Sequence, residues 1–584
     1  MGGSLLVLSI VVPIAGLLLA FAAGGRTGES VALATMPIGL AIAAAVAVTL
    51  QRATSPLVYL LGGWAPPLGV ALRADGLSAV MIVITAMVIC AIGIFARADF
   101  ATPEGVAEAR APLAFWILLL AIWSALNMVF VGGDLFTLYV ALELLTFAAV
   151  PLVSLDGRAE TLRAALRYLL FALLGSVLYL AGTALLYGAW GTLDIVLLSR
   201  LVRAEPTTIV AAALMTVGLL AKTALFPLHL WLPPAHAGAP AAASAVLSAL
   251  VVKGSFFIAV RLWFDVMPAL PGPSAAQLLA ALGAAAIVFG SVVALRQERL
   301  KLLVAYSTLA QIGYLFLMFP LAYDAAGTQQ LASGGALTGG MLQAISHATA
   351  KAAMFMAAGL IYEALGHDRM AKLAGIGRVL PITLVAFTLA GAALIGVPPS
   401  GAYAAKTLLL QAADETAQWW WAVMIQAGGI LTSSYVLLLL GHAVVPAHEP
   451  IALCAPVPRV REATVLALAL LSLLLGLVPW HTYLPISAQA LSNPLTFGAL
   501  WSALWSILAG GMIAILIGRY EIRFAGIPDV LVALVDRARR TALVVTSGVM
   551  RVDGTLRQWP AAVLALLAVT VLLGIAMSMG RLPR

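Results

Sequence analysis

Four lysines lie inside strongly apolar stretches of this chain, where a charged side chain is costly. They are Lys222, Lys253, Lys351 and Lys406, out of six lysines in 584 residues. An ammonium group at the centre of a bilayer costs at least about 2.5 kcal/mol, and Lys253 and Lys351 lie too far from the ends of their stretches to reach water. Glu143 is the one carboxylate at a similar depth. These residues indicate a function that requires buried charge.

Proton transfer is the chemistry that suits such residues. Burial disfavours the ammonium form of lysine and a nearby carboxylate favours it, so a lysine with a movable carboxylate partner can be loaded and unloaded with a proton. His229, His236 and His347 could connect such sites, because imidazole titrates near neutral pH. His347 and Lys351 are four residues apart and share one face of a helix. The residues therefore predict a buried proton relay.

The elements that position these residues are membrane-spanning helices. The chain is 63% hydrophobic and 10% charged, with a mean hydropathy of +1.07, whereas soluble proteins carry roughly 25% charged residues. This composition excludes a soluble protein and predicts an all-α polytopic membrane protein. About 20 apolar residues are needed for each span, which predicts sixteen spans near 4–23, 31–50, 76–96, 112–131, 134–154, 163–187, 207–227, 239–264, 275–296, 301–321, 337–365, 380–412, 419–444, 463–480, 495–518 and 560–579.

The distribution of basic residues predicts how the chain is oriented. With the N-terminus outside, 21 Lys and Arg residues fall in cytoplasmic connections and seven in the opposite ones, as the positive-inside rule requires. Both termini are therefore expected to be extracytoplasmic, and the first segment is expected to be a retained helix. Residues 528–551 alternate apolar and charged positions at helical spacing, which predicts a short lateral amphipathic helix.

Prolines interrupt two of the lysine-bearing spans. Pro227, Pro233 and Pro234 follow Lys222, and Pro398 and Pro399 precede Lys406. Broken helices at matching places in two halves are typical of inverted-repeat transporters. We therefore expect helices 1–3 in residues 1–111, a first five-helix repeat in 112–266, an inverted second repeat in 267–445, and C-terminal helices in 446–584.

Four stretches resemble a known family. They are LLAKTALFPLHLWLPPAHAGAPAAASAVLSALVVKG (219–254), LLVAYSTLAQIGY (302–314), SHATAKAAMFMAAG (346–359) and GVPPSGAYAAK (396–406). They are similar to the proton-translocating antiporter-like subunits, a family that includes the pumping subunits of respiratory complex I, the large subunits of Mrp-type antiporters and membrane subunits of membrane-bound hydrogenase and formate hydrogenlyase complexes. The resemblance covers about residues 75–445.

The resemblance implies a role for each matched residue. Glu143 matches the glutamate of the family's fifth helix, Lys222 its lysine partner on the seventh, Lys253 the relay lysine of the eighth, and Lys406 the exit lysine of the twelfth. His347 and Lys351 match the relay of the eleventh helix, whereas His229 and His236 are supporting candidates. Ala402 and Tyr403 stand where the family usually has Gly and Phe, although the spacing from the prolines to Lys406 is kept.

The leading hypothesis is a proton-translocating membrane subunit of a redox-driven complex of the quinone oxidoreductase or hydrogenase type. Cys90 and Cys454 are too few for an iron–sulfur cluster, so we expect no cofactor or metal here and electron transfer in partner subunits. An Mrp-like cation/proton antiporter, with Na⁺ handled through a partner, is the alternative. A lipid-linked glycosyltransferase and a non-pumping scaffold also remain open. The expected location is the bacterial or archaeal inner (plasma) membrane, with no nucleic-acid partner.

Overall fold

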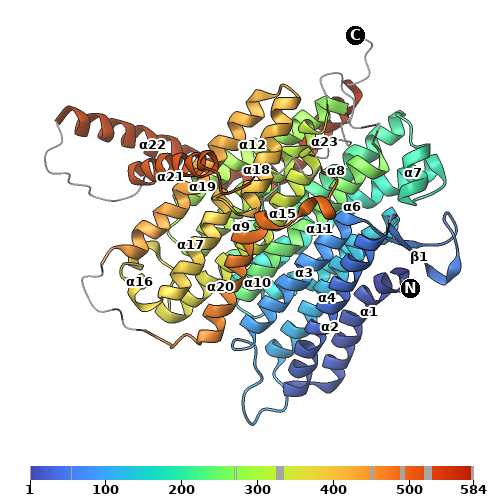
Figure 1. Cartoon of the computed structure of the whole chain (residues 1–584), viewed down its shortest axis with the longest axis horizontal. Helices are drawn as coiled ribbons and strands as arrows, with labels where there is room; N and C mark the ends of the chain where they lie inside the picture. Colours follow the sequence, from blue (N-terminus) through green and yellow to red (C-terminus); the bar gives the residue numbers. More distant parts are fainter. Residues whose placement is uncertain are drawn as a thin grey trace.

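The described part of the protein is a bundle of α-helices with a small β-hairpin (Figure 1). The computed structural model describes residues 2–53, 55–268, 270, 272–323, 335–446, 451, 453–486, 493–517 and 529–579. Within these residues, 15 helices are long and apolar enough to cross a membrane. The expected all-α polytopic class is therefore confirmed.

The N-terminal part contains three long helices and a two-stranded antiparallel sheet. The strands pair with Leu57 opposite Ala74 and Leu60 opposite Ala71. The sequence analysis did not predict this hairpin. The elements are α1 (Gly2–Ala23), α2 (Gly25–Arg52), β1 (Leu57–Leu60), a 3₁₀ turn (Leu61–Gly63), β2 (Ala71–Ala74) and α3 (Gly76–Ala96).

The next part includes the broken helix that follows Lys222. Helix α8 ends directly after this lysine, where Ala224 adopts a left-handed conformation with φ of 59°. The elements are α4 (Arg110–Val131), α5 (Leu135–Val153), α6 (Ala159–Trp190), α7 (Ile195–Leu201), α8 (Pro206–Thr223), α9 (Leu232–Gly238), and one continuous span made of α10 (Ala241–Val246), a π-helical segment (Leu247–Val251), α11 (Val252–Arg261) and a second π-helical segment (Leu262–Val266).

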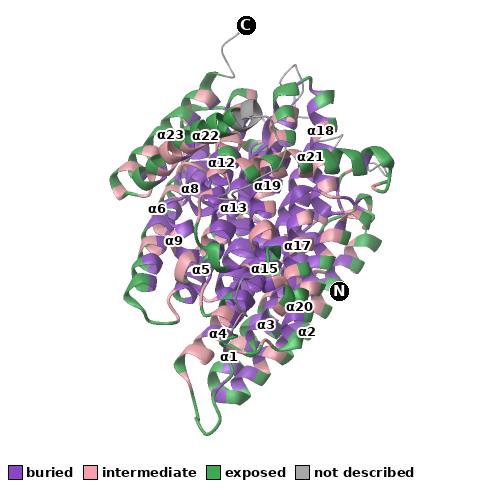
Figure 2. Cartoon of the chain, turned by 90° about the vertical axis from the view of Figure 1, so that its left-hand side faces the viewer, coloured by how far each residue is buried: buried purple, intermediate pink, exposed green. Residues whose placement is uncertain are grey.

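The third part includes the most deeply buried helix, α15, in which every residue from 336 to 361 is buried (Figure 2). The span expected at 380–412 is two helices, which are separated at residues 396–400. The elements are α12 (Gly272–Leu295), α13 (Leu300–Phe316), α14 (Met318–Leu321), α15 (Gly335–Leu365), a 3₁₀ turn (Met370–Lys372), α16 (Ile376–Val379), α17 (Pro381–Ile395), α18 (Gly401–Glu415) and α19 (Trp419–Val444).

The C-terminal part contains the expected lateral helix, which projects from the bundle at the upper left of Figure 1. Helix α22 contacts α12 and α21, and α23 packs against α8 and α12. The elements are α20 (Arg459–Leu474), 3₁₀ turns at Leu475–Leu477 and Trp480–Thr482, α21 (Phe497–Ile517), α22 (Asp529–Leu556) and α23 (Trp559–Met579).

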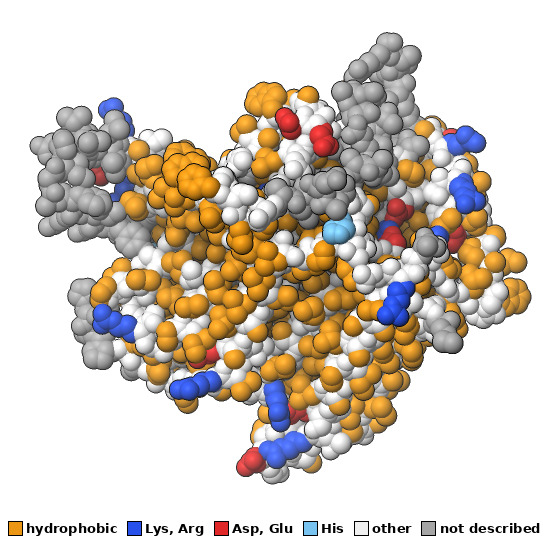
Figure 3. Space-filling model, in the orientation of Figure 1, with side chains coloured by type: hydrophobic (Ala, Val, Ile, Leu, Met, Phe, Trp, Pro, Cys, Tyr) orange, Lys and Arg blue, Asp and Glu red, His pale blue; other side chains and the backbone are white. Residues whose placement is uncertain are grey.

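The outer surface has the apolar character that a bilayer requires. Hydrophobic side chains cover most of the face in Figure 3, and the blue Lys and Arg side chains lie mainly toward its margins. This arrangement places polar groups where spans end and leaves the apolar sides of the helices for lipid or neighbouring subunits.

Candidate functional site

Glu143 and Lys222, which the resemblance pairs, form an ion pair between α5 and α8. The Lys222 Nζ atom lies 3.3 Å from the Glu143 carboxylate and donates to the Thr146 hydroxyl at 2.8 Å. Lys222 is 6% exposed and Glu143 is 14% exposed. A small cavity of about 10 Å³ beside Lys222 is the size of one water molecule. The lysine is thus buried, and the carboxylate is somewhat more exposed.

Lys253 and His347 meet at the middle of the bundle. The Lys253 ammonium is hydrogen-bonded to Nδ1 of His347 and donates to the backbone oxygen of Ser248 at 2.6 Å. Ser248 lies in the first π-helical segment, and π-helical turns are frequent at functional sites. Both side chains are buried. A neutral imidazole nitrogen that accepts from an ammonium is a direct route for proton exchange.

Lys351 lies one helical turn from His347 on α15 and contacts α13. Its ammonium donates to the Ser307 hydroxyl and to the backbone oxygen of Val304, the latter at 3.3 Å. Lys351 is fully buried and has no carboxylate among its described hydrogen-bond or ion-pair partners. Only neutral dipoles stabilise its protonated form among these partners, so no negative charge compensates the desolvation cost of the buried ammonium.

Lys406 occupies the second turn of α18, directly after the break. Its ammonium donates to the backbone oxygen of Ile395 and lies 5.5 Å from the centre of the Tyr314 ring. Gly396 and Gly429 leave the space for it, since a Cβ atom built on them would lie 3.2 and 2.9 Å from Nζ. The unpaired carbonyl at the end of α17 therefore holds the lysine.

Buried hydroxyl and amide groups that the sequence analysis did not select lie among these residues. Pairs form between Thr223 and Ser255 (2.8 Å), Ser248 and Thr308 (2.9 Å), Gln343 and Gln311 (2.8 Å), and Gln311 and Thr432 (3.0 Å). The stretch 302–314, one of the four that carry the resemblance, contains two of them, Thr308 and Gln311. Such residues are common in membrane helices, so only their cross-helix partners distinguish them.

The two supporting histidines have different environments, and neither forms a described hydrogen bond with a lysine. His229 is hydrogen-bonded to Asp553 of α22 at 3.2 Å. His236 stacks on Phe355 of α15 with 4.6 Å between ring centres. Phe355 is one helical turn from Lys351, so His236 lies beside the relay without bonding to it.

A polar cavity of about 640 Å³ opens at one end of the bundle, near His236. Burial raises the pKa of Asp99, one of its carboxyl groups, although Arg461 beside it acts in the opposite direction. The charged side chains that line it are Asp99, Asp156, Arg158, Glu160, Arg163, Arg167, Arg299, Lys301, Glu363 and Arg461. All six basic residues belong to the set predicted to face the cytoplasm. We call this cavity the vestibule.

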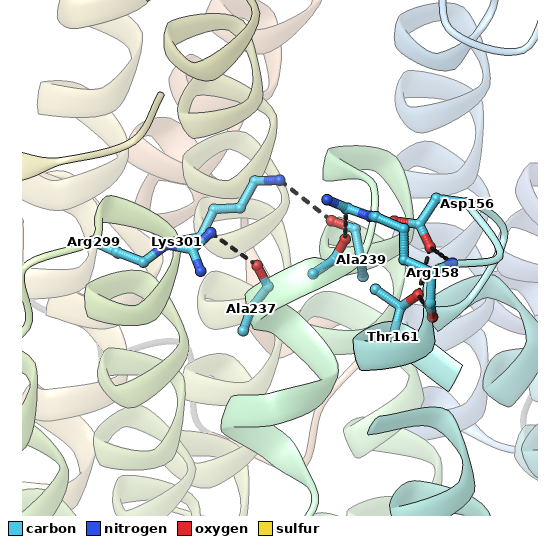
Figure 4. A network of polar contacts seen from close by, with 8 residues as sticks. Asp156, Arg158, Thr161, Ala237, Ala239, Arg299 and Lys301 are labelled. Carbon is cyan, nitrogen blue, oxygen red and sulfur yellow. Dashed lines mark hydrogen bonds and ion pairs between the residues drawn. The ribbon is translucent and has the colours of Figure 1, made fainter. Parts of the chain in front are cut away.

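Three basic side chains of the vestibule hold the end of α9. Arg299 donates to the carbonyl of Ala237 at 3.2 Å, Arg158 to that of Gly238 at 3.4 Å, and Lys301 to that of Ala239 at 3.3 Å (Figure 4). A helix end leaves carbonyl groups unpaired, and cations there also complement the helix dipole. The broken segment that carries His236 is thereby fixed against α6 and α13.

The comparisons with known proteins identify the family. A family model described as "NADH:quinone oxidoreductase/Mrp antiporter, TM" matches residues 132–432, more than half of the chain, and this range contains all eight residues selected from the sequence. The chain belongs to this family. It is accordingly a multi-pass integral membrane protein of the kind found in respiratory and antiporter complexes.

Individual relatives agree with this assignment. The chain is 33% identical over 391 residues to NADH-quinone oxidoreductase subunit N of Desulforudis audaxviator, which covers 65% of this chain and 73% of that protein. It is 26% identical over 446 residues to a Na⁺/H⁺ antiporter subunit of Bacillus subtilis, which covers 74% and 86%. A chain of the Mrp complex from Dietzia sp. shares the fold, with a TM-score of 0.72 at 24% identity over 86% of this chain and 99% of that one.

Proposed function

We propose that this chain is a proton-translocating membrane subunit of a multi-subunit redox-driven complex. The observation that carries the proposal is a stripe along α15. Gln343, His347, Lys351, Phe355 and Glu363 follow one another at intervals of four or eight residues, so they form a stripe that winds around the helix by roughly 40° for every four residues. The stripe runs for about 30 Å, from the vestibule, past His236 at Phe355, to the Gln343–Gln311 pair.

The residues have distinct roles in this proposal. Protons enter from the vestibule, and the relay consists of Lys351, His347 and Lys253. Glu143 controls the charge of Lys222, because its approach stabilises the ammonium and its withdrawal releases the proton. Lys406 is the exit residue in the second half. The contacts given above support these roles, since each lysine already has a partner that can accept or stabilise its proton.

We also propose the division into inverted repeats at 112–266 and 267–445. The presence of a broken helix in each half supports it: one break follows α8 after Lys222, and the other separates α17 from α18 before Lys406. The expected setting is the inner (plasma) membrane of a bacterium or archaeon, with both termini outside and other membrane subunits as neighbours.

The test replaces the lysines one at a time in the intact complex, reconstituted in proteoliposomes with a pH-sensitive dye. Lys222→Ala, Lys253→Ala and Lys406→Ala should each abolish proton movement without preventing insertion, because each removes a titratable group from the relay and alanine is tolerated in lipid. Lys372→Ala is the control, since Lys372 is exposed outside the spans. Wild-type proton movement in all three variants, Lys222→Ala, Lys253→Ala and Lys406→Ala, would contradict the proposal.

An Mrp-like cation/proton antiporter subunit is the second candidate. The relative from Bacillus subtilis named as part of a Na⁺/H⁺ antiporter favours it. Proton movement that starts with electron donor and does not require Na⁺ supports the redox-driven complex. Proton movement that requires an imposed Na⁺ or K⁺ gradient and no electron donor supports the antiporter. Inverted vesicles from cells with and without the chain distinguish the two.

A further inference from the structure

Asp553 is a fully buried carboxylate on α22, whose other described side chains are mostly exposed or half-buried. Arg551, Val552, Gly554 and Thr555 around it are all exposed, whereas Asp553 has an exposed fraction of 0%. Burying a carboxylate is unfavourable unless it is paired and hydrogen-bonded. This side chain of α22 therefore has a specific site inside the bundle.

The site of Asp553 is formed by three elements. The carboxylate is 3.2 Å from Nε2 of His229 in the segment between α8 and α9, accepts from the Tyr306 hydroxyl of α13 at 2.7 Å, and pairs with Arg557 at 2.8 Å. Burial by itself raises the pKa of Asp553, but the hydrogen bonds from His229 and Tyr306 and the charge of Arg557 hold it below its usual value. The group is thus ionised at neutral pH.

The ionised carboxylate determines how His229 is arranged. A carboxylate only accepts hydrogen bonds, so Nε2 of His229 carries the hydrogen. The other ring nitrogen, Nδ1, is buried and has no hydrogen-bond partner among the described residues. This nitrogen is free to take up a proton, and the resulting imidazolium would face a buried negative charge. Phe226 and Phe289 pack against the ring, with centres 5.7 and 5.4 Å away.

The same site adjoins the relay through three consecutive residues of α13. Tyr306 donates to Asp553, Ser307 accepts from Lys351, and Thr308 is bonded to Ser248, whose backbone oxygen accepts from Lys253. One turn of α13 therefore contacts the lateral helix through Tyr306 and Lys351 through Ser307, and it is linked to Lys253 through Ser248. A displacement of α22 at Asp553 would therefore be transmitted through Tyr306 to Ser307 and Thr308, which contact Lys351 and Ser248.

We infer that Asp553 is a positioning residue of the proton path: it orients His229 and supplies the negative charge that stabilises its imidazolium form. The lateral helix thereby belongs to the proton-transfer machinery as well as to the scaffold. This inference rests on the proposed function of proton translocation. Asp553 lies outside residues 132–432, the range of the family match.

The test compares three variants in the intact complex. Asp553→Asn keeps the shape and removes the charge, Asp553→Glu keeps the charge, and Asp536→Asn removes an exposed charge from the same helix as a control. Asp553→Asn should lower pumping at pH 7.5 by about tenfold, because it replaces a charge-assisted hydrogen bond to His229 with a neutral one, and the loss should be smaller at pH 6. Asp553→Glu should retain most activity, and Asp536→Asn should match the wild type.

Two results would overturn the inference. One is a wild-type pH profile in Asp553→Asn; the other is an equal loss at every pH in Asp553→Asn and Asp553→Glu, which would make Asp553 an anchor only. Absence of pumping in the wild type would contradict the proposed function instead. In that case ¹⁵N NMR of histidine, assigned with His229→Gln, still decides: a weaker imidazolium signal at pH 7 in Asp553→Asn supports the inference, and an unchanged signal overturns it.

Discussion

Glu143 holds its carboxylate 3.3 Å from a lysine on another helix, and the two residues differ in how they are enclosed. The lysine has three hydrogen-bond acceptors, at Glu143, Thr146 and the backbone of Leu142. Loss of the carboxylate alone would leave the lysine with neutral acceptors. The charge of Glu143, more than its shape, is consequently the property to alter.

Glu143→Gln should assemble nearly normally and lose proton pumping, because the amide keeps the size and hydrogen bonding but cannot stabilise the ammonium electrostatically. Glu143→Asp should retain partial activity, since the charge remains on a shorter side chain. Dye-based pumping of the reconstituted complex measures both, and Glu415→Gln at the exposed end of α18 is the matched control. A fully active Gln variant, or an Asp variant as inactive as Gln, would show that Glu143 is not a switch.

At the scale of elements, the break after α8 creates the site of Lys222, and the break between α17 and α18 creates the site of Lys406. Helix α17 ends at Ile395, and Gly396 turns the chain with φ of 88°, a conformation that favours glycine. Ser400 then caps α18 by accepting from the backbone of Tyr403 at 3.1 Å. These local signals expose the carbonyl of Ile395 to Lys406.

Gly429→Ala tests whether the space beside Lys406 matters. The added Cβ would lie 2.9 Å from Nζ, so the flexible end of the lysine must move away from its acceptor. We expect pumping to fall roughly tenfold, because displacement of a reacting group by about 1 Å can cost up to a hundredfold. Thermal stability should change little, as it should in Gly574→Ala, where a Cβ meets nothing within 4 Å. Unchanged pumping in Gly429→Ala would show that proton transfer does not depend on the exact position of the Lys406 ammonium.

At the scale of the whole molecule, the vestibule gathers basic residues that the positive-inside rule assigns to the cytoplasmic side, and the side that it faces stays a prediction. Its basic residues come from separate parts of the sequence, yet the fold gathers them at one end. The side chain of Arg461 on α20 pairs with both Asp99, at 2.8 Å, and Glu363 of α15. The positive-inside rule requires these basic residues to lie at the same end of the bundle, as they do. The rule also predicts that this end faces the cytoplasm.

Cysteine labelling checks that orientation. In a background without Cys90 and Cys454, a cysteine at Arg369 should react with a membrane-impermeant reagent only from the cytoplasm, and one at Arg200 only from outside; both positions are exposed. Native Cys454, which is also exposed, should behave like position 369. The opposite pattern would invert the topology and exchange the entrance and exit sides of the proton path.

The sequence by itself determined the membrane class, the approximate spans and the buried lysines, because apolar length and isolated charge are local properties that no packing can hide. It also located the two breaks through their prolines. The resemblance then indicated Glu143 as the partner of Lys222, and these two side chains lie 3.3 Å apart in the structure.

Only the tertiary structure decided which groups meet across helices. Asp553 is 324 residues from His229, and on a helix rich in charged residues nothing local marks it as the buried one. Ser307, Thr308 and Gln311 are similarly ordinary in sequence, because Ser, Thr and Gln occur widely in membrane helices. A polar side chain acquires its role from the partner that packing brings to it, and that partner comes from a distant part of the chain.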